Sequence, residues 1–155
     1  MDLTQLANLG EFIGGVAVLV TLIYLAVQVR QNSRDVRAGN FHRITDSFNA
    51  LNIGVASNNE VARIYRVGLD SSDSLTEDER VQFGMLLLSS LRIHETIFYQ
   101  KKMGAGEHAL WNTEIGTMRF YFSHASVRDW WRANPLSLTP EFRKFIEDEL
   151  LEAGG

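Results

Sequence analysis

The sequence predicts an all-α protein in which a long N-terminal transmembrane helix continues into a small helical bundle. Two observations carry this prediction. Residues 12–29 contain no charged side chain and 14 apolar ones. The rest of the chain shows helix caps and stop signals but no convincing period-two alternation, so a β-sheet is not expected. With 155 residues, no cysteine and two prolines, the chain suits one domain with an appendage, and it is neither a disulfide scaffold nor a disordered chain.

The uncharged stretch has the length of a membrane span. Its 18 residues cover about 27 Å as a helix, close to the ~30 Å hydrocarbon thickness of a bilayer. A buried core helix is the alternative, but it would carry more polar residues than Thr21, Tyr24 and Gln28. A cleaved signal peptide fits less well, because no basic residue precedes the stretch and no small-residue cleavage motif follows it. The predicted organisation is a transmembrane helix at 1–29, a juxtamembrane continuation at 30–56 and a cytoplasmic helical domain at 57–155.

Arginines follow the span directly. Arg30, Arg34, Arg37 and Arg43 face only one acidic residue, Asp35, so residues 30–43 carry a charge of +3. Positive charge marks the cytoplasmic side of a span, which places the N-terminus outside and the C-terminal domain in the cytoplasm. The first three arginines continue the lipid-facing side of the helix, where they are expected to reach lipid headgroups.

One side of the predicted span is built from small and polar residues, and we call this face the seam. Its members are spaced three and four apart and share a sector about 100° wide, whereas the opposite sector is bulky. Small residues let membrane helices approach closely, although glycine and alanine are also common in membrane helices generally. The seam predicts self-association of the span. Its residues are Ala7, Gly10, Gly14, Ala17, Thr21, Tyr24 and Gln28.

Beyond the span, the seam side turns polar and gives two interpretations. In a dimer or trimer it would be a hydrated or hydrogen-bonded cytoplasmic face. In a larger ring it would line a water-filled vestibule, with acidic rings that favour cations. The candidate pore or vestibule residues are Thr21, Tyr24, Gln28, Asn32, Asp35, His42 and Asp46.

Capping signals divide the remaining chain into helices. Ser57 with Glu60 and Thr76 with Glu79 have capping-box spacing, and Thr139 precedes a proline at a first helical position. Glycines predict the stops, at Gly68, at the pair Gly104 and Gly106, and at Gly154. The expected helices are a first one ending near Val55, then 58–67, 77–103, 107–123, 126–133 and 140–152.

Apolar spacing predicts the core of this domain, with the most apolar helix at its centre. Helical stripes run through Trp111, Ile115, Met118 and Phe122 and through Phe142, Phe145, Ile146 and Leu150. His94 lies on an apolar face and is expected to be buried, with Glu95, Arg119 or a backbone carbonyl as its hydrogen-bond partner. Trp130 and Trp131, flanked by arginines, suit either a membrane interface or core and subunit contacts.

The sequence offers little catalytic chemistry. The four histidines, His42, His94, His108 and His124, lack any spacing that places two ligands on one metal. No phosphate loop, nucleophile elbow or cysteine–histidine pair occurs, so we expect no catalytic residue, metal or cofactor. From residue 44 onward the net charge is −5, which gives no electrostatic case for binding nucleic acid.

The opening LANLGEFIGGVAVLVTLIYLAVQVRQN, Leu6 to Asn32, resembles the start of a group of small bacterial membrane proteins that are usually described as uncharacterised. This resemblance implies a bacterial inner-membrane setting and brings no activity, substrate or site.

Three classes of function remain. The leading hypothesis is a homo-oligomeric, membrane-anchored, non-enzymatic assembly whose cytoplasmic module scaffolds or regulates an unknown cytoplasmic protein. The second is a homo-oligomeric ion-conducting pore lined by the polar face of the first helix. The third is a membrane-tethered enzyme or ligand-binding bundle that uses His94.

Overall fold

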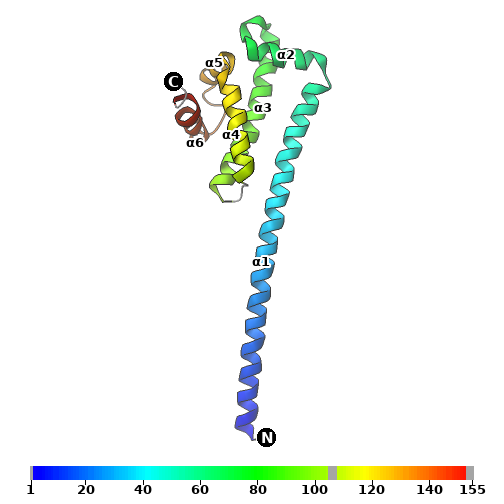
Figure 1. Cartoon of the computed structure of the whole chain (residues 1–155), viewed down its shortest axis with the longest axis vertical. Coiled ribbons are helices and arrows are strands. Elements are labelled where there is room, and N and C mark those ends of the chain that lie inside the picture. Colours follow the sequence, from blue (N-terminus) through cyan, green and yellow to red (C-terminus); the bar gives the residue numbers. More distant parts are fainter. Residues whose placement is uncertain (1, 105–107, 153–155) are drawn as a thin grey trace. The chain divides into compact units, whose positions relative to one another are not determined.

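The computed structural model describes residues 2–104 and 108–152, and all regular structure among them is helical, as predicted (Figure 1). The chain divides into two compact units, Met1–Gly39, here the N-terminal unit, and Asn40–Gly155, here the body. The helices are α1 (Leu3–Ala56), α2 (Asn59–Asp70), a 3₁₀ turn η1 (Ser72–Ser74), α3 (Glu77–Lys102), α4 (His108–Ser123), α5 (Ala125–Ala133), α6 (Pro140–Ile146) and η2 (Glu147–Glu152).

The predicted helix boundaries fall within three residues of the observed ones. Two details differ. The predicted last helix, 140–152, is α-helical only to Ile146 and continues as the π-helix η2. The start of the predicted helix 107–123 lies partly outside the described residues, and the described part begins at His108.

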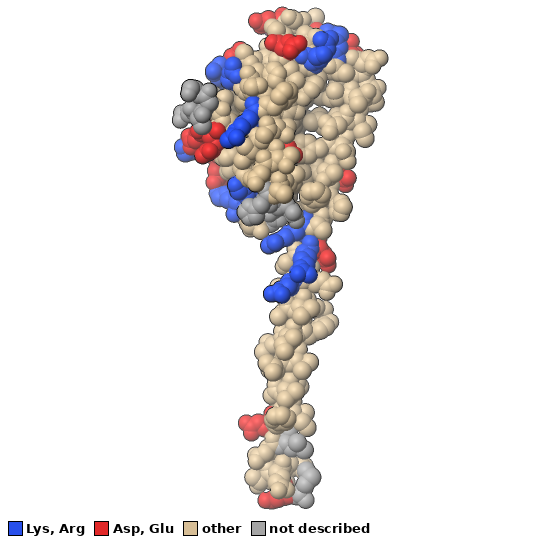
Figure 2. Space-filling model, in the orientation of Figure 1, with Lys and Arg blue, Asp and Glu red and all other residues tan. Residues whose placement is uncertain are grey.

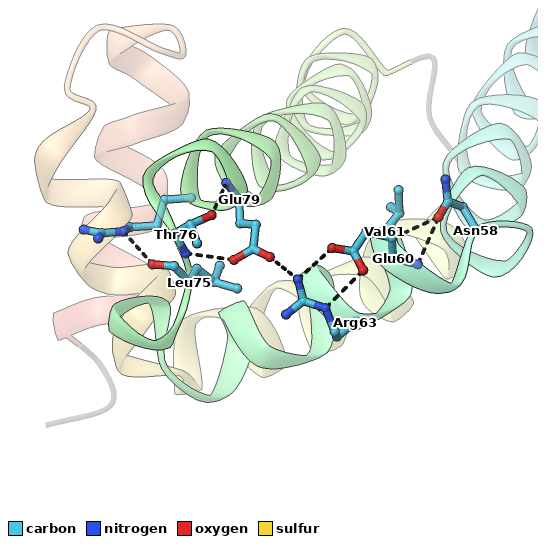
Figure 3. Close-up of polar contacts among 8 residues, drawn as sticks. Asn58, Glu60, Val61, Arg63, Leu75, Thr76 and Glu79 are labelled. Carbon is cyan, nitrogen blue, oxygen red and sulfur yellow. Dashed lines mark hydrogen bonds and ion pairs between the residues drawn. The ribbon is translucent and has the colours of Figure 1, made fainter.

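Capping side chains fix the N-terminal ends of α2 and α3 (Figure 3). The predicted capping box of α3 is confirmed, because the Thr76 amide donates to Glu79 Oε2 at 2.8 Å and the Glu79 amide donates to Thr76 Oγ1 at 3.4 Å. The predicted box at Ser57 is wrong. Asn58 caps α2 by accepting from the amides of Glu60 and Val61, while the Ser57 hydroxyl donates back to the Ile53 carbonyl.

Two predicted glycine stops have different outcomes. Gly104 ends α3 with a positive φ of 67°, a conformation that glycine adopts without steric cost. Gly68 is not a stop, because it is buried inside α2. A Cβ atom there would lie 2.5 Å from the Phe83 ring, so the glycine lets α2 and α3 pack closely. The predicted stops at Gly106 and Gly154 lie outside the described residues.

The core of the body forms around α3, which packs against α2 and α4 (Figure 1). Both predicted apolar stripes point into it: Met118 and Phe142 are fully buried, and Ile115 and Phe145 pack at its edge. The large, fully buried side chains are Trp131, Phe83, Phe142, Ile64, Leu87, Leu91, Met118, Ile146, His94 and Val127.

A second, smaller cluster attaches the body's part of α1. Ile44 is buried with Ile97 of α3 and Trp111 of α4, and Phe48 packs beside them. His42 and Asp46 are exposed, and at about 100° per residue they lie on the other side of the helix from Ile44 and Phe48. The body therefore covers only one side of this part of α1.

Glycine substitutions test the close contact between α2 and α3. We expect Gly68→Ala to destabilise the body by about 1–3 kcal/mol, because Phe83 must move to admit the methyl group. Gly54→Ala is the matched control, since no atom lies within 4 Å of its Cβ position, and there alanine should stabilise the helix by about 0.5–1 kcal/mol. Urea unfolding of the detergent-solubilised chain, followed by circular dichroism, measures both; a Gly68→Ala protein as stable as wild type would contradict the packing argument.

The junction of α2 and α3 predicts sensitivity to acid. The Thr76 amide, and then Arg63, hold the pKa of Glu79 below its usual value of 4.5. Since folding lowers this pKa, the stability it contributes is fully present above the unfolded-state value and is lost as pH falls through the folded-state value. Glu79→Gln should therefore lower stability at neutral pH and reduce the loss of stability between about pH 5 and pH 3. Urea unfolding at several pH values measures this, and parallel acid limbs for the two proteins would contradict it.

Candidate functional site

The N-terminal unit presents an uncovered apolar helix. Every side chain described in residues 2–39 is exposed, and α1 is the one described helix that is long and apolar enough to cross a membrane. The most apolar part has a mean hydropathy of 2.3, and none of it is buried. In Figure 2 this part of the unit is a tan band without Lys, Arg, Asp or Glu. The blue side chains at its C-terminal end are the arginines that follow the uncharged stretch.

Among the described residues, the seam side chains are exposed and nothing packs against the seam glycines. No atom lies within 4 Å of the Cβ position at Gly10 or Gly14. The Thr21 hydroxyl donates to the Ala17 carbonyl at 2.8 Å, and Gln28 Nε2 donates to the Tyr24 hydroxyl at 2.8 Å. The Thr21 hydroxyl and one N–H of Gln28 are thus bonded within the helix, and the outer surface of the seam is exposed.

The candidate vestibule residues are also exposed. Asn32 and Asp35 lie on the N-terminal unit, and His42 and Asp46 lie on the uncovered side of α1 in the body. The arginines predicted to reach headgroups, Arg30, Arg34 and Arg37, are exposed as well, and no carboxylate among the described residues forms an ion pair with them.

His94 is the most enclosed titratable group in the body, as its spacing predicted. It is fully buried, and its Nδ1 lies 2.8 Å from the Ser90 carbonyl. Its Nε2 lies 3.1 Å from Glu114 Oε2. A carbonyl only accepts, so Nδ1 carries a hydrogen, and a single proton must lie between Nε2 and the carboxylate. The backbone carbonyl was among the expected partners, whereas Glu114 was not, and the expected partners Glu95 and Arg119 are not the ones that bond to the two ring nitrogens.

Aromatic groups close the space around this pair. The Phe48 ring lies 5.4 Å from the His94 ring and the Tyr121 ring 6.3 Å from it, both edge-on. The Tyr65 hydroxyl donates to the Tyr121 hydroxyl at 2.9 Å, and burial together with this hydrogen bond raises the pKa of Tyr65. With both nitrogens bonded and its faces covered, His94 offers no open position to a ligand. It links α3 to α4 and to α1.

Glu95 faces away from His94 and fixes the start of α6. Its Oε1 accepts from the amide and hydroxyl of Thr139 at 2.8 and 2.7 Å, and its Oε2 accepts from Arg92 at 3.1 Å. The Tyr99 hydroxyl donates to the Thr139 hydroxyl at 2.9 Å. Thr139 is therefore the N-cap residue, as predicted, but its side chain bonds to α3 instead of to its own helix.

The two neighbouring tryptophans pack against the body. Trp131 is buried, donates to Glu147 Oε1 at 3.3 Å and lies beneath the Arg143 guanidinium, 3.9 Å from the ring centre. Trp130 is half-buried, and its Nε1 lies 2.7 Å from the Cβ position of Gly84. The interpretation of one Trp as a core residue is confirmed, and the second covers α3.

Within residues 2–104 and 108–152, no three His, Asp or Glu side chains are placed to hold a metal ion. No family model matches this sequence, and no curated protein or solved structure matches it either.

Substitutions at Glu114 test the role of His94 as a bonded core residue. An amide at position 114 can donate to Nε2 of neutral His94, so Glu114→Gln should stay within about 0.5 kcal/mol of wild type. Glu114→Leu leaves the buried Nε2 without a partner and should cost about 1–3 kcal/mol. Urea unfolding measures the difference, and equal stability of the two variants would show that the contact contributes nothing.

Proposed function

We propose that this protein is a single-pass membrane protein of the bacterial inner membrane, with its N-terminus outside and its body in the cytoplasm. The supporting observation is the uncovered apolar helix, because about 18 uncharged residues without internal packing require a cover that the bilayer supplies. The arginines after the stretch favour this orientation. Two features argue against a cleaved signal sequence. The uncharged stretch is longer than the usual apolar region of signal peptides, and α1 continues to Ala56.

The span also associates with copies of itself through the seam. Glycine in a helix interior costs about 0.5–1 kcal/mol relative to alanine. In the body, Gly68 and Gly84 offset this cost, because an aromatic side chain packs within 2.7 Å of each Cβ position. Gly10 and Gly14 have no such neighbour. A second helix in close contact with the seam would use the space that they leave.

The assembled membrane helices hold several cytoplasmic bodies together, and the body acts as a non-enzymatic scaffold or regulator of a cytoplasmic protein. What favours this role over catalysis is the body's use of its titratable groups. His94 contacts Glu114 of α4, Glu95 accepts from Thr139 at the start of α6, and Glu79 pairs with Arg63 of α2, so each of the three holds α3 to another helix.

An ion-conducting pore is the second candidate. The observation that favours it is the uncovered polar side of α1, where His42 and Asp46 are exposed opposite Ile44. Subunit number separates the two candidates, because a dimer encloses no lumen, whereas a ring of several copies could place Asp35 and Asp46 around an axis.

Leucine substitutions test the seam. Gly14→Leu should shift the detergent-solubilised protein toward monomer, because the larger side chain holds the two helices apart. Gly15→Leu is the matched control: this neighbouring glycine lies outside the seam, also has no atom within 4 Å of its Cβ position, and should keep the wild-type mass. Light scattering corrected for bound detergent measures both masses and gives the subunit number.

Several results would contradict the proposal. An unchanged mass for Gly14→Leu, or an equal effect of Gly15→Leu, would reject the seam. A wild-type monomer would reject self-association. Extraction of the wild-type chain from membranes by alkaline carbonate, or loss of the residues before Arg30 from the mature protein, would reject the membrane anchor.

A further inference from the structure

A groove lies between the body's part of α1 and the C-terminal half of α3. Its volume is about 410 Å³, within the range of pockets that hold small organic ligands. Ile44 and Ile93 form an apolar floor, and Ile44 is only 4% exposed. Ile44 belongs to the cluster that attaches α1 to α3 and α4, so the floor rests on the core.

Both charged side chains around this floor are hydrogen-bond donors. Arg43 projects from α1 and Arg92 from α3, and the amides of Asn40 and Gln100 complete the rim. The hydroxyls of two further lining residues already donate to carbonyls of their own helices, Ser47 to Arg43 and Thr96 to Arg92. The lining contains no carboxylate.

Neither guanidinium is fully engaged by the protein. Arg43 donates to Asn40 Oδ1 and forms no ion pair with a described carboxylate. Arg92 donates to Glu95 through one nitrogen at 3.1 Å, and its side chain remains 55% exposed. Glu95 uses its other oxygen for Thr139. Both arginines therefore keep N–H groups that can bind an anion from two helices at once.

This lining is unusual for the body, where 12 Lys and Arg stand against 16 Asp and Glu, a net charge of −4. Another hollow of the body, of about 550 Å³, also contains two arginines, Arg119 and Arg128. There Glu149 belongs to the lining, and Arg128 is bonded to the carbonyls of Phe122 and Ser123 at 2.6 and 2.7 Å. That hollow lacks a comparable surplus of free donors.

We propose that the groove between α1 and α3 binds a phosphate ester that carries an apolar group. The forked guanidinium groups of Arg43 and Arg92 match the oxygens of a phosphate, and Ile44 and Ile93 contact the organic part. The ligand is a soluble organic phosphate or the phosphodiester headgroup of an anionic lipid, which share this chemistry. The site needs no second copy and does not depend on the proposed self-association.

Ligand titration of the full chain in neutral detergent tests the groove. The probes are phenyl phosphate, inorganic phosphate and, in mixed micelles, phosphatidylglycerol against phosphatidylcholine, all at one ionic strength. The test variant is Arg43→Gln/Arg92→Gln, and the control is Arg66→Gln/Arg132→Gln, which removes two exposed arginines elsewhere on the body. Arg43→Lys/Arg92→Lys keeps both charges without the fork. Thermal unfolding confirms that each variant is folded.

Wild type and control should bind phenyl phosphate more tightly than inorganic phosphate, and the test variant should bind it at least about tenfold more weakly. The lysine variant should fall between them. The same dependence on Arg43 and Arg92 for phosphatidylglycerol alone would assign the groove to a lipid headgroup. Equal affinities of wild type and test variant for every probe, or an equal loss in the control, would overturn the proposal. Self-association is read separately from the mass of the unliganded protein.

Discussion

The uncovered apolar surface of α1 is the constraint on which the rest of the molecule depends. Twelve large side chains between Phe12 and Val29 are at least 44% exposed. Full burial of one such side chain is worth about 1.5–3 kcal/mol, and since somewhat more than half of each is exposed on average, covering all twelve is worth roughly 10–20 kcal/mol. That is comparable to the whole folding free energy of a typical domain. Surface ion pairs in the body contribute far less than this free energy, so the apolar side chains of α1 need a cover from outside the chain.

Glycine has different surroundings in the two units. In the body, the rings of Phe83 and Trp130 pack against Gly68 and Gly84, so glycine allows close packing between helices of one chain. In the N-terminal unit, four glycines, Gly10, Gly14, Gly15 and Gly39, meet no atom within 4 Å of their Cβ positions. A helix that loses stability at four positions without an internal gain is marginal by itself in water. In the proposed membrane setting, the backbone hydrogen bonds of the residues before Arg30 would not be exchanged for water, which would offset the loss at Gly10, Gly14 and Gly15.

Helix identity and core faces could be predicted from the sequence because both depend on local spacing. Apolar residues at helical intervals identified the buried Met118 and Phe142, and Thr76 with Glu79 identified a real cap. Ser57 and Gly68 were misassigned because tertiary context decides them. A neighbouring Asn58 competes better for the amides of Glu60 and Val61, and Phe83 comes from a different helix.

The His94–Glu114 contact follows from a regularity of the sequence, the equal spacing of the two residues from a glycine between two helices. Gly104 terminates α3, and the two residues lie ten positions before and ten after it. In an antiparallel pair of helices, residues equidistant from the turn face each other. Ile97 and Trp111, seven positions on either side, obey the same rule. The groove could not be found this way, since it depends on which side of α1 the body covers.

That sidedness also constrains any assembly of α1. From Asn40 onward, Ile44 and Phe48 face the body and leave His42 and Asp46 exposed, so a neighbouring copy could approach this side without displacing the body. A dry contact there would bury the Asp46 carboxylates of two copies against each other, and unpaired buried charge is costly. This part of α1 must therefore stay hydrated in any symmetric assembly. In such an assembly, close helix contact would be confined to the seam, where Gly10 and Gly14 would allow it and no charged side chain on that face would oppose it.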